Sequence, residues 1–316
     1  MGPTSKIIAI GHTALDSIYR IAAFPQKPTK VRALEHVEAG GGSAANAAVA
    51  IARLGGEIHL WSRIGSDEAG QRALAALTLA GVDTKHIRVQ VGSRTSTSVI
   101  IVDKQGVALI VCERDHAMPG NPGWLPLNDI ASAGAVLSDT TWHEATSEAF
   151  RYAATVNVPT ILDIDVAGGL PSREILERTS YAIASAGGLE LITHGGGQLD
   201  RLGQLIEKGI RHAGVTLGRD GYLGISQNGE VLRQEAFKEK TVDTTGAGDA
   251  FHGAFAWALN NNLEDAECTR VGAAVAALNC RRLGARAGLP TISELDRFLK
   301  ARSGRGITTG ILRKHS

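Results

Sequence analysis

The sequence is poor in cysteine and in aromatic residues, and it contains no long apolar run. Its cysteines are Cys112, Cys268 and Cys280, an odd number whose spacing matches no zinc or haem pattern. That count argues against a disulfide framework and favours a reducing, cytoplasmic location. No apolar stretch reaches the roughly 18 residues that a membrane helix needs. The polar segment 1–6 leads us to expect no signal peptide.

The charge of the chain is nearly balanced, with a formal net charge of +1 over 316 residues. Nothing in this balance favours nucleic acid or an anionic membrane surface as a partner. Apolar residues make up 43% and charged residues 21%, which is ordinary for a soluble globular protein. The length allows one large α/β domain or two smaller units. The 38 glycines exceed average usage and suit loops that approach a ligand with their backbone.

Short apolar strands alternate with helical segments along most of the chain. The strands expected from apolar runs are Lys6 to Gly11, Glu57 to Ile64, Ala135 to Leu137, Thr160 to Ile164, Leu189 to Ile192 and Gly214 to Leu217. Helices are expected from Ala44 to Leu54, which stops at Gly55, and from Ala69 to Ala80, which stops at Gly81. This alternation predicts an α/β fold with a mainly parallel sheet and helices on both faces.

Two segments depart from that rhythm and predict a small antiparallel sheet. Thr29 to Glu38 alternates apolar and polar residues, as a half-exposed strand does. Thr95 to Glu113 is typical of a hairpin that turns at Asp103-Lys104-Gln105-Gly106. We expect these strands to form a β lid (12–38 and 95–115) over a core made of 1–11, 39–94 and 116–316. The alternative is that they are edge strands of the main sheet.

The strongest motif is Asp243-Thr244-Thr245-Gly246-Ala247-Gly248-Asp249. It follows a strand-like segment and opens a helix that is expected to run to about Leu259. The glycines let backbone N–H groups converge at a helix N-terminus, where the helix dipole also favours an anion. A phosphoryl group in transfer needs such an anion hole, and Asp249 lies beside it as a candidate general base. The alternative, a glycine turn with a capping aspartate, would be preferred for a shorter motif.

Other glycine-rich fingerprints do not fit this motif. A Walker P-loop needs Gly-Lys-Ser/Thr, which is absent. A dinucleotide fingerprint needs another glycine where Phe251 stands, and it usually lies in the first strand-to-helix turn. The first turn here, Gly11 to Asp16, has only one glycine, so an oxidoreductase is the weakest alternative.

With these residues in place, the sequence resembles the PfkB family of carbohydrate kinases, from Ile8 to about Pro290. The resemblance implies a ribokinase-like three-layer α/β/α core with a small antiparallel β lid. It also implies a phosphotransfer from ATP, with Mg²⁺, to a sugar hydroxyl. Carried over to the motif, it makes Gly246, Ala247 and Gly248 the anion hole and Asp249 the catalytic base.

A second family signature lies in the run Gly40-Gly41-Gly42-Ser43-Ala44-Ala45-Asn46. The resemblance makes Gly41, Gly42 and Asn46 sugar-binding residues, because small residues let the sugar reach the backbone and Asn46 both donates and accepts. Asp16 matches the early aspartate of the family, which grips sugar hydroxyls. Taken alone, Asp16 would be a plain loop carboxylate. His143 follows a strand end and is a candidate sugar contact, although a structural role is the more ordinary one.

The nucleotide side is expected from two later motifs. Thr216-Leu217-Gly218-Arg219-Asp220-Gly221 resembles the family turn that lines the nucleotide, which makes Thr216, Gly218 and Gly221 candidate ATP contacts. The loop that begins at Asn279 resembles the one that borders adenine. Relatives often hold a monovalent cation there, so Asp243 and Thr245 are candidate K⁺ ligands, and carbonyl oxygens suit such an ion.

The sequence departs from the family in one respect. Relatives usually carry Asn-x-x-Glu, which organises magnesium, after the strand that we match to Leu189 to Ile192. The chain has Thr193 to Gln198 there, with no acidic member in register. Asp163 and Asp165, at the end of the preceding expected strand, can support Mg²⁺ through water or simply cap that strand.

The identity of the sugar stays open between a ketohexose such as fructose and a ribose-like pentose. Arg286 to Pro290 and Asp139 to His143 resemble a ketohexose branch that includes sulfofructose kinases, but Thr141 stands where a compared member has arginine. Lys27, Lys30 and Arg32 are read as a solvated lid surface. A nucleoside kinase of the same fold and a non-catalytic sugar-binding sensor remain alternatives. By analogy with relatives, the apolar lid segment predicts a homodimer.

Overall fold

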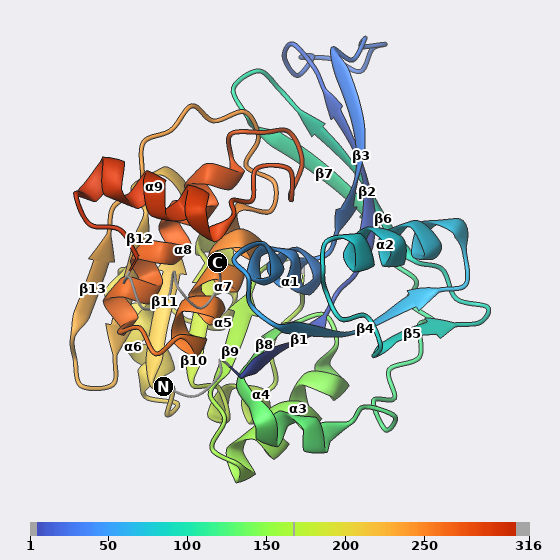
Figure 1. Cartoon of the computed structure of the whole chain (residues 1–316). Helices are drawn as coiled ribbons and strands as arrows, with labels where there is room; N and C mark the ends of the chain where they lie inside the picture. The colour runs from blue at the N-terminus through green and yellow to red at the C-terminus, as the bar shows by residue number, and fades with distance from the viewer. Residues whose placement is uncertain (1–4, 167, 308–316) are drawn as a thin grey trace.

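Two β-sheets organise the chain in the computed structural model, which describes residues 5–166 and 168–307. The larger has nine strands in the order β13-β12-β11-β10-β9-β8-β1-β4-β5, and the smaller has four in the order β3-β2-β6-β7. Figure 1 shows the small sheet rising from the edge of the body that holds the large one. Each pairing from β5 through to β11 is parallel, whereas β12 runs antiparallel to both of its neighbours.

The bounds of the large-sheet strands follow the apolar runs of the sequence. They are β1 (Lys6–Gly11), β4 (Ile58–Gly65), β5 (Ile87–Gln90), β8 (Ala133–Asp139), β9 (Thr160–Ile164), β10 (Tyr181–Ser185), β11 (His212–Thr216), β12 (Tyr222–Ser226) and β13 (Val231–Gln234). The central strands are almost wholly buried, as is usual for parallel strands that are covered on both faces.

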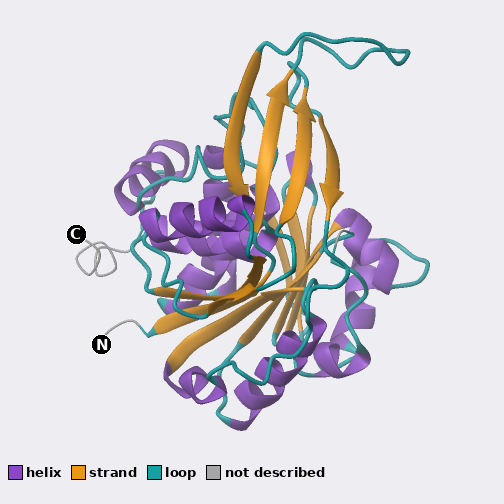
Figure 2. Cartoon of the chain, turned by 90° about the vertical axis from the view of Figure 1, so that its right-hand side faces the viewer, coloured by secondary structure: helices purple, strands orange, loops and turns teal. Residues whose placement is uncertain are grey.

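Helices cover both faces of this sheet, as Figure 2 shows. Successive residues of β1 explain the layering, because Ile7 and Ala9 belong to one apolar cluster and Ile8 and Ile10 to the other. The first face is covered by α1 (Ser43–Arg53), α2 (Glu68–Leu79), α7 (Ala247–Asn260), α8 (Asp265–Asn279) and α9 (Ile292–Ser303). The second is covered by α3 (His143–Thr155), α4 (Arg173–Glu177), α5 (Ala186–Ile192) and α6 (Gln198–Ile206). The expected three-layer α/β/α core is confirmed.

The small sheet consists of β2 (Ala14–Arg20), β3 (Glu35–Gly41), β6 (Ser96–Val102) and β7 (Ala108–Glu113). Its pairs β2–β3 and β6–β7 are antiparallel, as expected, but β2 pairs with β6 in parallel. The sheet has a small apolar cluster of its own, with Ile18, Ile100 and Val102 fully buried or nearly so. It is therefore a separate layer and not an extension of the main sheet.

One expected strand is wrong, and another is shorter than expected. Leu189 to Ile192 lies in helix α5, and the strand of this region is β10, which ends at Ser185. A short apolar run fits a buried helix as well as a strand, and here the Ser185 hydroxyl accepts a hydrogen bond from the Gly188 N–H (3.0 Å) and caps the helix. In the segment 29–38, strand structure begins only at Glu35.

No helix within 5–166 and 168–307 is long and apolar enough to cross a lipid bilayer. The basic tail 302–316 lies for the most part outside the described residues.

Helices α1 and α7 approach each other closely enough to require a glycine. A Cβ built on Gly253 of α7 would lie 2.4 Å from the carbonyl oxygen of Ala47 in α1. Such a distance is shorter than any normal contact, and the partner is backbone that cannot swing aside. The two helix N-termini, with the motifs that precede them, are held side by side by this contact.

We expect Gly253→Ala to push the two helices apart. Overpacking of this kind costs about 1–3 kcal/mol, so the unfolding temperature should fall. Gly203→Ala in α6 is the matched control, because its added Cβ would meet nothing within 4 Å and Ala favours a helix over Gly by about 1 kcal/mol. Thermal unfolding of both variants checks the prediction, which an unchanged or raised melting temperature for Gly253→Ala would contradict.

Candidate active site

The glycine turn before α7 has the geometry of an anion-binding loop. Gly246 caps the helix in the left-handed region, with φ of 71°, and a Cβ there would lie 2.6 Å from the Cβ of Ala285. A Cβ on Gly248 would face open space. Asp249 lies in the first turn of α7, as predicted. Ala285 therefore covers the first turn at Gly246, whereas the turn is open at Gly248.

The backbone donors of this turn are not all available. The Ala247 N–H donates to the Thr244 carbonyl (3.1 Å), so one of the predicted anion-hole donors already has an acceptor. The first N–H groups of a helix have no acceptor within the helix itself. The N–H groups of Gly248 and Asp249 are therefore the first-turn donors best suited to an external anion, with the positive end of the helix dipole behind them.

Asp249 is linked to the N-terminal glycine motif by a chain of hydrogen bonds. The Asn46 Nδ2 donates to Asp249 Oδ2 at 2.7 Å, so these two predicted site residues meet across 203 positions of sequence. The Asn46 Oδ1 accepts from Arg286 Nε at 2.7 Å. Arg286 Nη2 in turn donates to the Gly41 carbonyl at 2.9 Å. Arg286 was not predicted as a site residue, although it lies in a quoted motif.

Asp16 lies next to the same glycines. A Cβ on Gly41 would fall 2.2 Å from a carboxylate oxygen of Asp16. Gly42 has φ of 90°, and a Cβ there would meet the His12 carbonyl at 2.4 Å. Gly41 thus makes room for the aspartate that was predicted to bind the sugar, and Gly42 makes room for the backbone at His12.

Burial makes Asp249 a carboxylate that titrates near neutrality. Removal from solvent, with the nearby Asp163 adding to it, raises the pKa of Asp249 to about 7. The hydrogen bond from Asn46 and the nearby His252 oppose that rise. His252 itself lies 3.5 Å from Asp163 between Nε2 and Oδ1. A base with this pKa can both take up and release a proton at physiological pH.

Asp16, the acid next to the N-terminal glycines, also has a shifted pKa. Burial raises the pKa of Asp16 to about 6, while the Ser98 hydroxyl and the Arg286 guanidinium hold it down. Asp16 is 5% exposed, so its charge has little solvent to stabilise it. The site therefore places one arginine, Arg286, in electrostatic contact with both the buried Asp16 and the partly buried Asp249.

Asp139 was not predicted as a site residue, yet it organises the start of α1. Its Oδ2 accepts from the N–H groups of His12 (2.8 Å) and Ala44 (3.0 Å), and its Oδ1 accepts from the Thr141 N–H (2.9 Å). Gly42, the residue that precedes α1, has no side chain with which to cap it. Asp139 supplies this cap from the end of β8.

The predicted nucleotide turn lies at the end of β11. Gly218 and Gly221 adopt φ of 57° and 88°, and the Leu217 N–H donates to the Gly221 carbonyl at 2.8 Å. Thr216 ends the strand and donates to the Ala184 carbonyl of β10 at 3.4 Å. Because the carboxyl ends of parallel strands share one edge, this turn lies on the same side of the sheet as Asp139 and Asp163.

Asp243, Thr245 and Asn279 join the glycine turn to the late loop. Asp243 Oδ1 accepts from the Thr245 N–H (2.9 Å) and hydroxyl (2.7 Å), and its Oδ2 accepts from the Gly284 N–H (2.8 Å). Asn279 Nδ2 donates to the Ala285 carbonyl at 3.0 Å. These contacts clamp two loops together. Whether Asp243 and Thr245 also bind a cation stays a prediction.

The strand correction also moves the position at which the magnesium motif was sought. The residues that follow β10 are Ala186, Gly187, Gly188 and Leu189, and they too contain no Asn-x-x-Glu. Asp165 instead ties the ends of two strands, because its Oδ1 accepts from the Ser185 hydroxyl at 2.7 Å. Asp163 and Asp165 both act electrostatically on Asp249, so they lie near the proposed base.

His143 contacts a different segment from the other predicted sugar residues. Its Nε2 lies 2.6 Å from the Leu170 carbonyl, in the loop that follows β9. It opens α3 at the carboxyl end of β8, on the correct edge of the sheet. No hydrogen bond joins it to Asp16, Asn46 or Asp249 within the described part of the chain. Its role in sugar binding stays a prediction.

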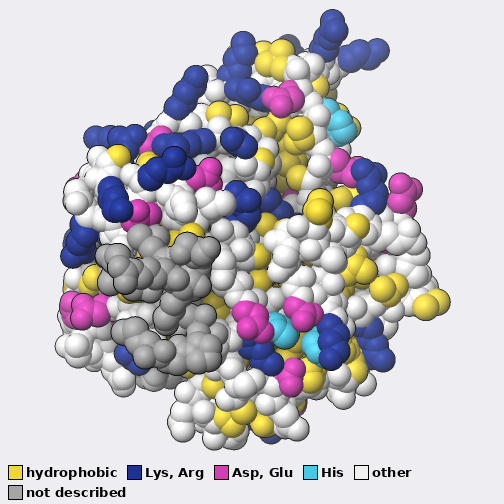
Figure 3. All heavy atoms as spheres, in the orientation of Figure 1, with side chains coloured by type: hydrophobic (Ala, Val, Ile, Leu, Met, Phe, Trp, Pro, Cys, Tyr) yellow, Lys and Arg dark blue, Asp and Glu magenta, His cyan; other side chains and the backbone are white. Residues whose placement is uncertain are grey.

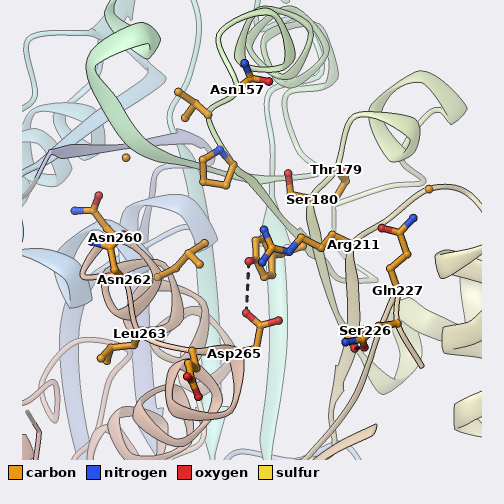
Figure 4. A pocket seen from close by; sticks show the side chains of 18 of the residues that line it. Asn157, Thr179, Ser180, Arg211, Ser226, Gln227, Asn260, Asn262, Leu263 and Asp265 are labelled. Carbon is orange, nitrogen blue, oxygen red and sulfur yellow. Dashed lines mark hydrogen bonds between the residues drawn. The ribbon is translucent and has the colours of Figure 1, made fainter. Parts of the chain in front are cut away.

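A cavity of about 1500 Å³ lies at the opposite end of the sheet (Figure 4). It is lined near the amino ends of strands by residues such as Pro159, Ser180 and Arg211, and by Asp265, to which the Tyr181 hydroxyl donates at 3.4 Å. It contains none of the predicted site residues. The reaction is therefore not assigned to this cavity, despite its size.

A three-layer α/β core, a separate four-stranded sheet and a glycine turn that opens a helix beside a partly buried carboxylate together define a phosphotransferase with a hydroxyl acceptor. The family model described as pfkB family carbohydrate kinase matches residues 4–292 of the chain. The protein belongs to this family of carbohydrate kinases, and the family predicted from the sequence is confirmed.

Individual relatives are similar along almost their whole length. The ribokinase of Staphylococcus aureus is 26% identical over 93% of this chain and 99% of its own. The nucleoside kinase of Methanothermobacter thermautotrophicus is 25% identical over 96% and 98%. Among solved structures, a candidate ribokinase from Agrobacterium tumefaciens is 30% identical, with a TM-score of 0.87 over 96% of this chain and 98% of that one. The Arabidopsis thaliana ribokinase, solved with ribose and ATP, shares the fold at 24% identity and a TM-score of 0.82, over 94% and 99%.

Proposed function

We propose that this protein transfers the γ-phosphate of MgATP to a terminal hydroxyl of a sugar, either ribose or a ketohexose such as fructose. The observation that carries the proposal is the 2.7 Å hydrogen bond between Asn46 and Asp249 beside the open first turn of α7. It brings a sugar-binding amide, a base and an anion-binding helix start into one place. Ribokinases among the relatives support the ribose arm.

In this proposal the acceptor lies between the residues of the N-terminal glycine motif and Asp249. Asp16, Gly41, Gly42 and Asn46 hold the sugar, and Asp249 takes the proton of the attacking hydroxyl. The new O–P bond forms in line as the bond to ADP breaks. The N–H groups at the start of α7 stabilise the negative charge that the phosphoryl group carries.

The nucleotide in this proposal lies over the turn from Thr216 to Gly221 and the loop that begins at Asn279. Among the described residues, no group of three or more His, Cys, Asp or Glu side chains is arranged to hold a metal ion. In this proposal Mg²⁺ arrives with ATP and is held by phosphate oxygens and water. Asp163 and Asp165 are suited to contact that water shell, and K⁺ at Asp243 and Thr245 is a further proposal.

The four-stranded sheet in this proposal serves as the lid, made of 12–38 and 95–115 against the remaining core. Asp16 and Gly41 lie on β2 and β3, so the lid itself carries acceptor contacts. Its closure over the sugar would exclude water from the phosphoryl group, which suppresses hydrolysis of ATP.

A coupled ADP-release assay tests the reaction class and the acceptor together. We expect turnover with D-ribose or D-fructose, and a loss of about 10²- to 10⁴-fold in kcat for Asp249→Asn. Asp129→Asn is the matched control. Asp129 lies before β8, at the end of the sheet away from the proposed site, so this variant should retain activity.

Three results of this assay would contradict the proposal. Unchanged kcat in Asp249→Asn would show that Asp249 is not the base. Turnover confined to adenosine or inosine would make the protein a nucleoside kinase. Calorimetric binding of a sugar without ADP formation would make it a sensor.

The pH dependence of kcat/KM for the sugar should show two ionisations. Asp249 must be ionised to accept a proton, so the rate should fall as the pH drops through about 7. Asp16 must be ionised to accept from sugar hydroxyls, so the fall should steepen below about pH 6. A plot of log(kcat/KM) against pH should have a slope near 1 between about pH 7 and about pH 6 and a slope near 2 below about pH 6. Asp16→Asn should remove the second slope, and a flat profile from about pH 5.5 to about pH 8 would contradict the assignment.

We further propose that the protein forms a homodimer through its lids. The edge strand β7 exposes Leu109, Ile110 and Val111 at 50%, 50% and 60%, and hydrophobic side chains show along the lid in Figure 3. An exposed apolar edge strand is a natural pairing surface. Sedimentation equilibrium should give a dimer mass, and Ile110→Lys should shift it to the monomer. A monomeric wild-type protein at micromolar concentration would contradict the proposal.

A further inference from the structure

Arg286 is a partly buried charged side chain at the centre of the site, and the phosphotransfer scheme above does not use it. Its guanidinium donates from Nε to Asn46 Oδ1 and from Nη2 to the Gly41 carbonyl. It acts electrostatically on both Asp16 and Asp249. A buried arginine is costly unless its donors are satisfied and its charge is balanced. Here two of its donors have partners, and two carboxylates provide the opposite charge.

We propose that Arg286 is a positioning residue for phosphotransfer, which fixes the Asn46 amide so that this amide holds Asp249 in the orientation of a base. The proposal rests on the proposed function, because it assigns a role relative to Asp249. Arg286 touches neither ATP nor the reacting atoms in this scheme and acts through Asn46.

The direction of the Asn46 amide follows from chemistry alone. A guanidinium has only donors, so it can bond only the oxygen of the amide. The NH₂ end of Asn46 must then point the other way, towards Asp249, and it donates to Oδ2. A carboxylate held through one oxygen keeps its Oδ1 for the acceptor hydroxyl. Without Arg286 the Asn46 oxygen loses this donor, so the amide is held less firmly against Asp249.

The charge of Arg286 also acts on the acids around it. Burial lowers the pKa of Arg286 to about 10, so it stays charged at neutral pH. Besides Arg286, the groups that act on Asp249 are the carboxylates of Asp163 and Asp165 from the end of β9, His252 from its own helix, and Asn46 from α1. Arg286, which follows the loop 279–285, supplies a positive charge that favours the ionised form of Asp249. Its removal leaves the negative charges of Asp163 and Asp165 to raise the pKa of Asp249 further.

Gly40 leaves the space that the Arg286 guanidinium occupies. A Cβ on Gly40 would fall 2.0 Å from Arg286 Nη1, and Gly40 is not among the positive-φ glycines. Alanine is therefore acceptable to the backbone at this position and conflicts only with the guanidinium. Since that group ends a flexible side chain, Gly40→Ala should move Arg286 away from Asn46 while it changes no charge.

The first test measures the ionisation of Asp249 directly, without any substrate. Protein labelled with ¹³C at the Asp carboxyl carbons is titrated by NMR, and the Asp249 signal is the one missing in Asp249→Asn. We expect its midpoint to rise by about one pH unit in Arg286→Met, because an opposite charge nearby lowers the pKa of a carboxylate by 1–3 units. Arg286→Lys should keep the midpoint within a few tenths of the wild-type value, since it keeps the charge.

The second test separates geometry from charge in the kinetics with the sugar that the ADP-release assay identifies. Arg286→Lys and Gly40→Ala should both lose about 10- to 100-fold in kcat without a shift of the acid limb, because a displacement of about 1 Å can cost that much. Arg286→Met should lose as much kcat and should also shift the acid limb of the pH profile to higher pH. KM for ATP should change little in all three. Arg297→Met, at an exposed arginine of α9 outside the proposed site, is the matched control and should match wild type.

The outcomes distinguish this inference from the function on which it rests. If Asp249→Asn is inactive but Arg286→Met keeps both the wild-type carboxyl midpoint and the wild-type kcat, the kinase stands and the role of Arg286 is wrong. If Gly40→Ala retains full kcat, the geometric half of the role is wrong. If Asp249→Asn is active, Asp249 is not the base and the proposed function is wrong. Circular dichroism of each variant confirms that it is folded.

Discussion

The site depends on the close approach of two helix N-termini, those of α1 and α7. Gly253 has no side chain, so the helices touch at the Ala47 carbonyl. Asn46 and Asp249, which come from distant parts of the sequence, can then share a 2.7 Å hydrogen bond. A helix start offers free N–H groups and the positive end of a dipole. At the start of α1 the N–H groups of Ala44 and Ala45 already donate to Asp139 and to the His12 carbonyl, so the start of α7 is the one left for an external anion.

The glycines of this protein provide space for charged groups as much as flexibility. The missing Cβ atoms of Gly40 and Gly41 leave room for the Arg286 guanidinium and the Asp16 carboxylate. Gly246 leaves room for the late loop at Ala285. In each case the group that fills the space comes from a segment far away in sequence. Long-range packing, and not local turn chemistry alone, therefore explains why several of these positions are glycine.

Much of the fold could be predicted because its signals are local. Apolar runs located β1, β9 and β11, glycine stops located the ends of α1 and α2, and the motif that ends at Asp249 located the start of α7. The error at Leu189 to Ile192 arose because a short segment with three apolar residues satisfies a helix as well as a strand, and the deciding contact was the Ser185 cap. The parallel pairing of β2 with β6 depends on tertiary contacts that no local pattern encodes.

The candidate site was predictable only for residues that belong to a contiguous motif. Asp139 and Arg286 were missed as site residues because the groups that they bind, Ala44 and Asn46, lie 95 and 240 positions away. The signal that could have found them is the same in both cases. Each is a charged residue beside a glycine or a strand end in an otherwise apolar or small-residue segment, where an unpaired charge would be costly.

The central claim is that chemistry takes place between Asp249 and the first turn of α7. A crystal structure with ADP, Mg²⁺, the accepted sugar and aluminium fluoride as a phosphoryl mimic tests it most directly. The account predicts that the fluoride accepts from the Gly248 N–H and that a sugar hydroxyl lies within about 3 Å of the Asp249 carboxylate. A sugar bound elsewhere, or a mimic held away from the start of α7, would contradict it.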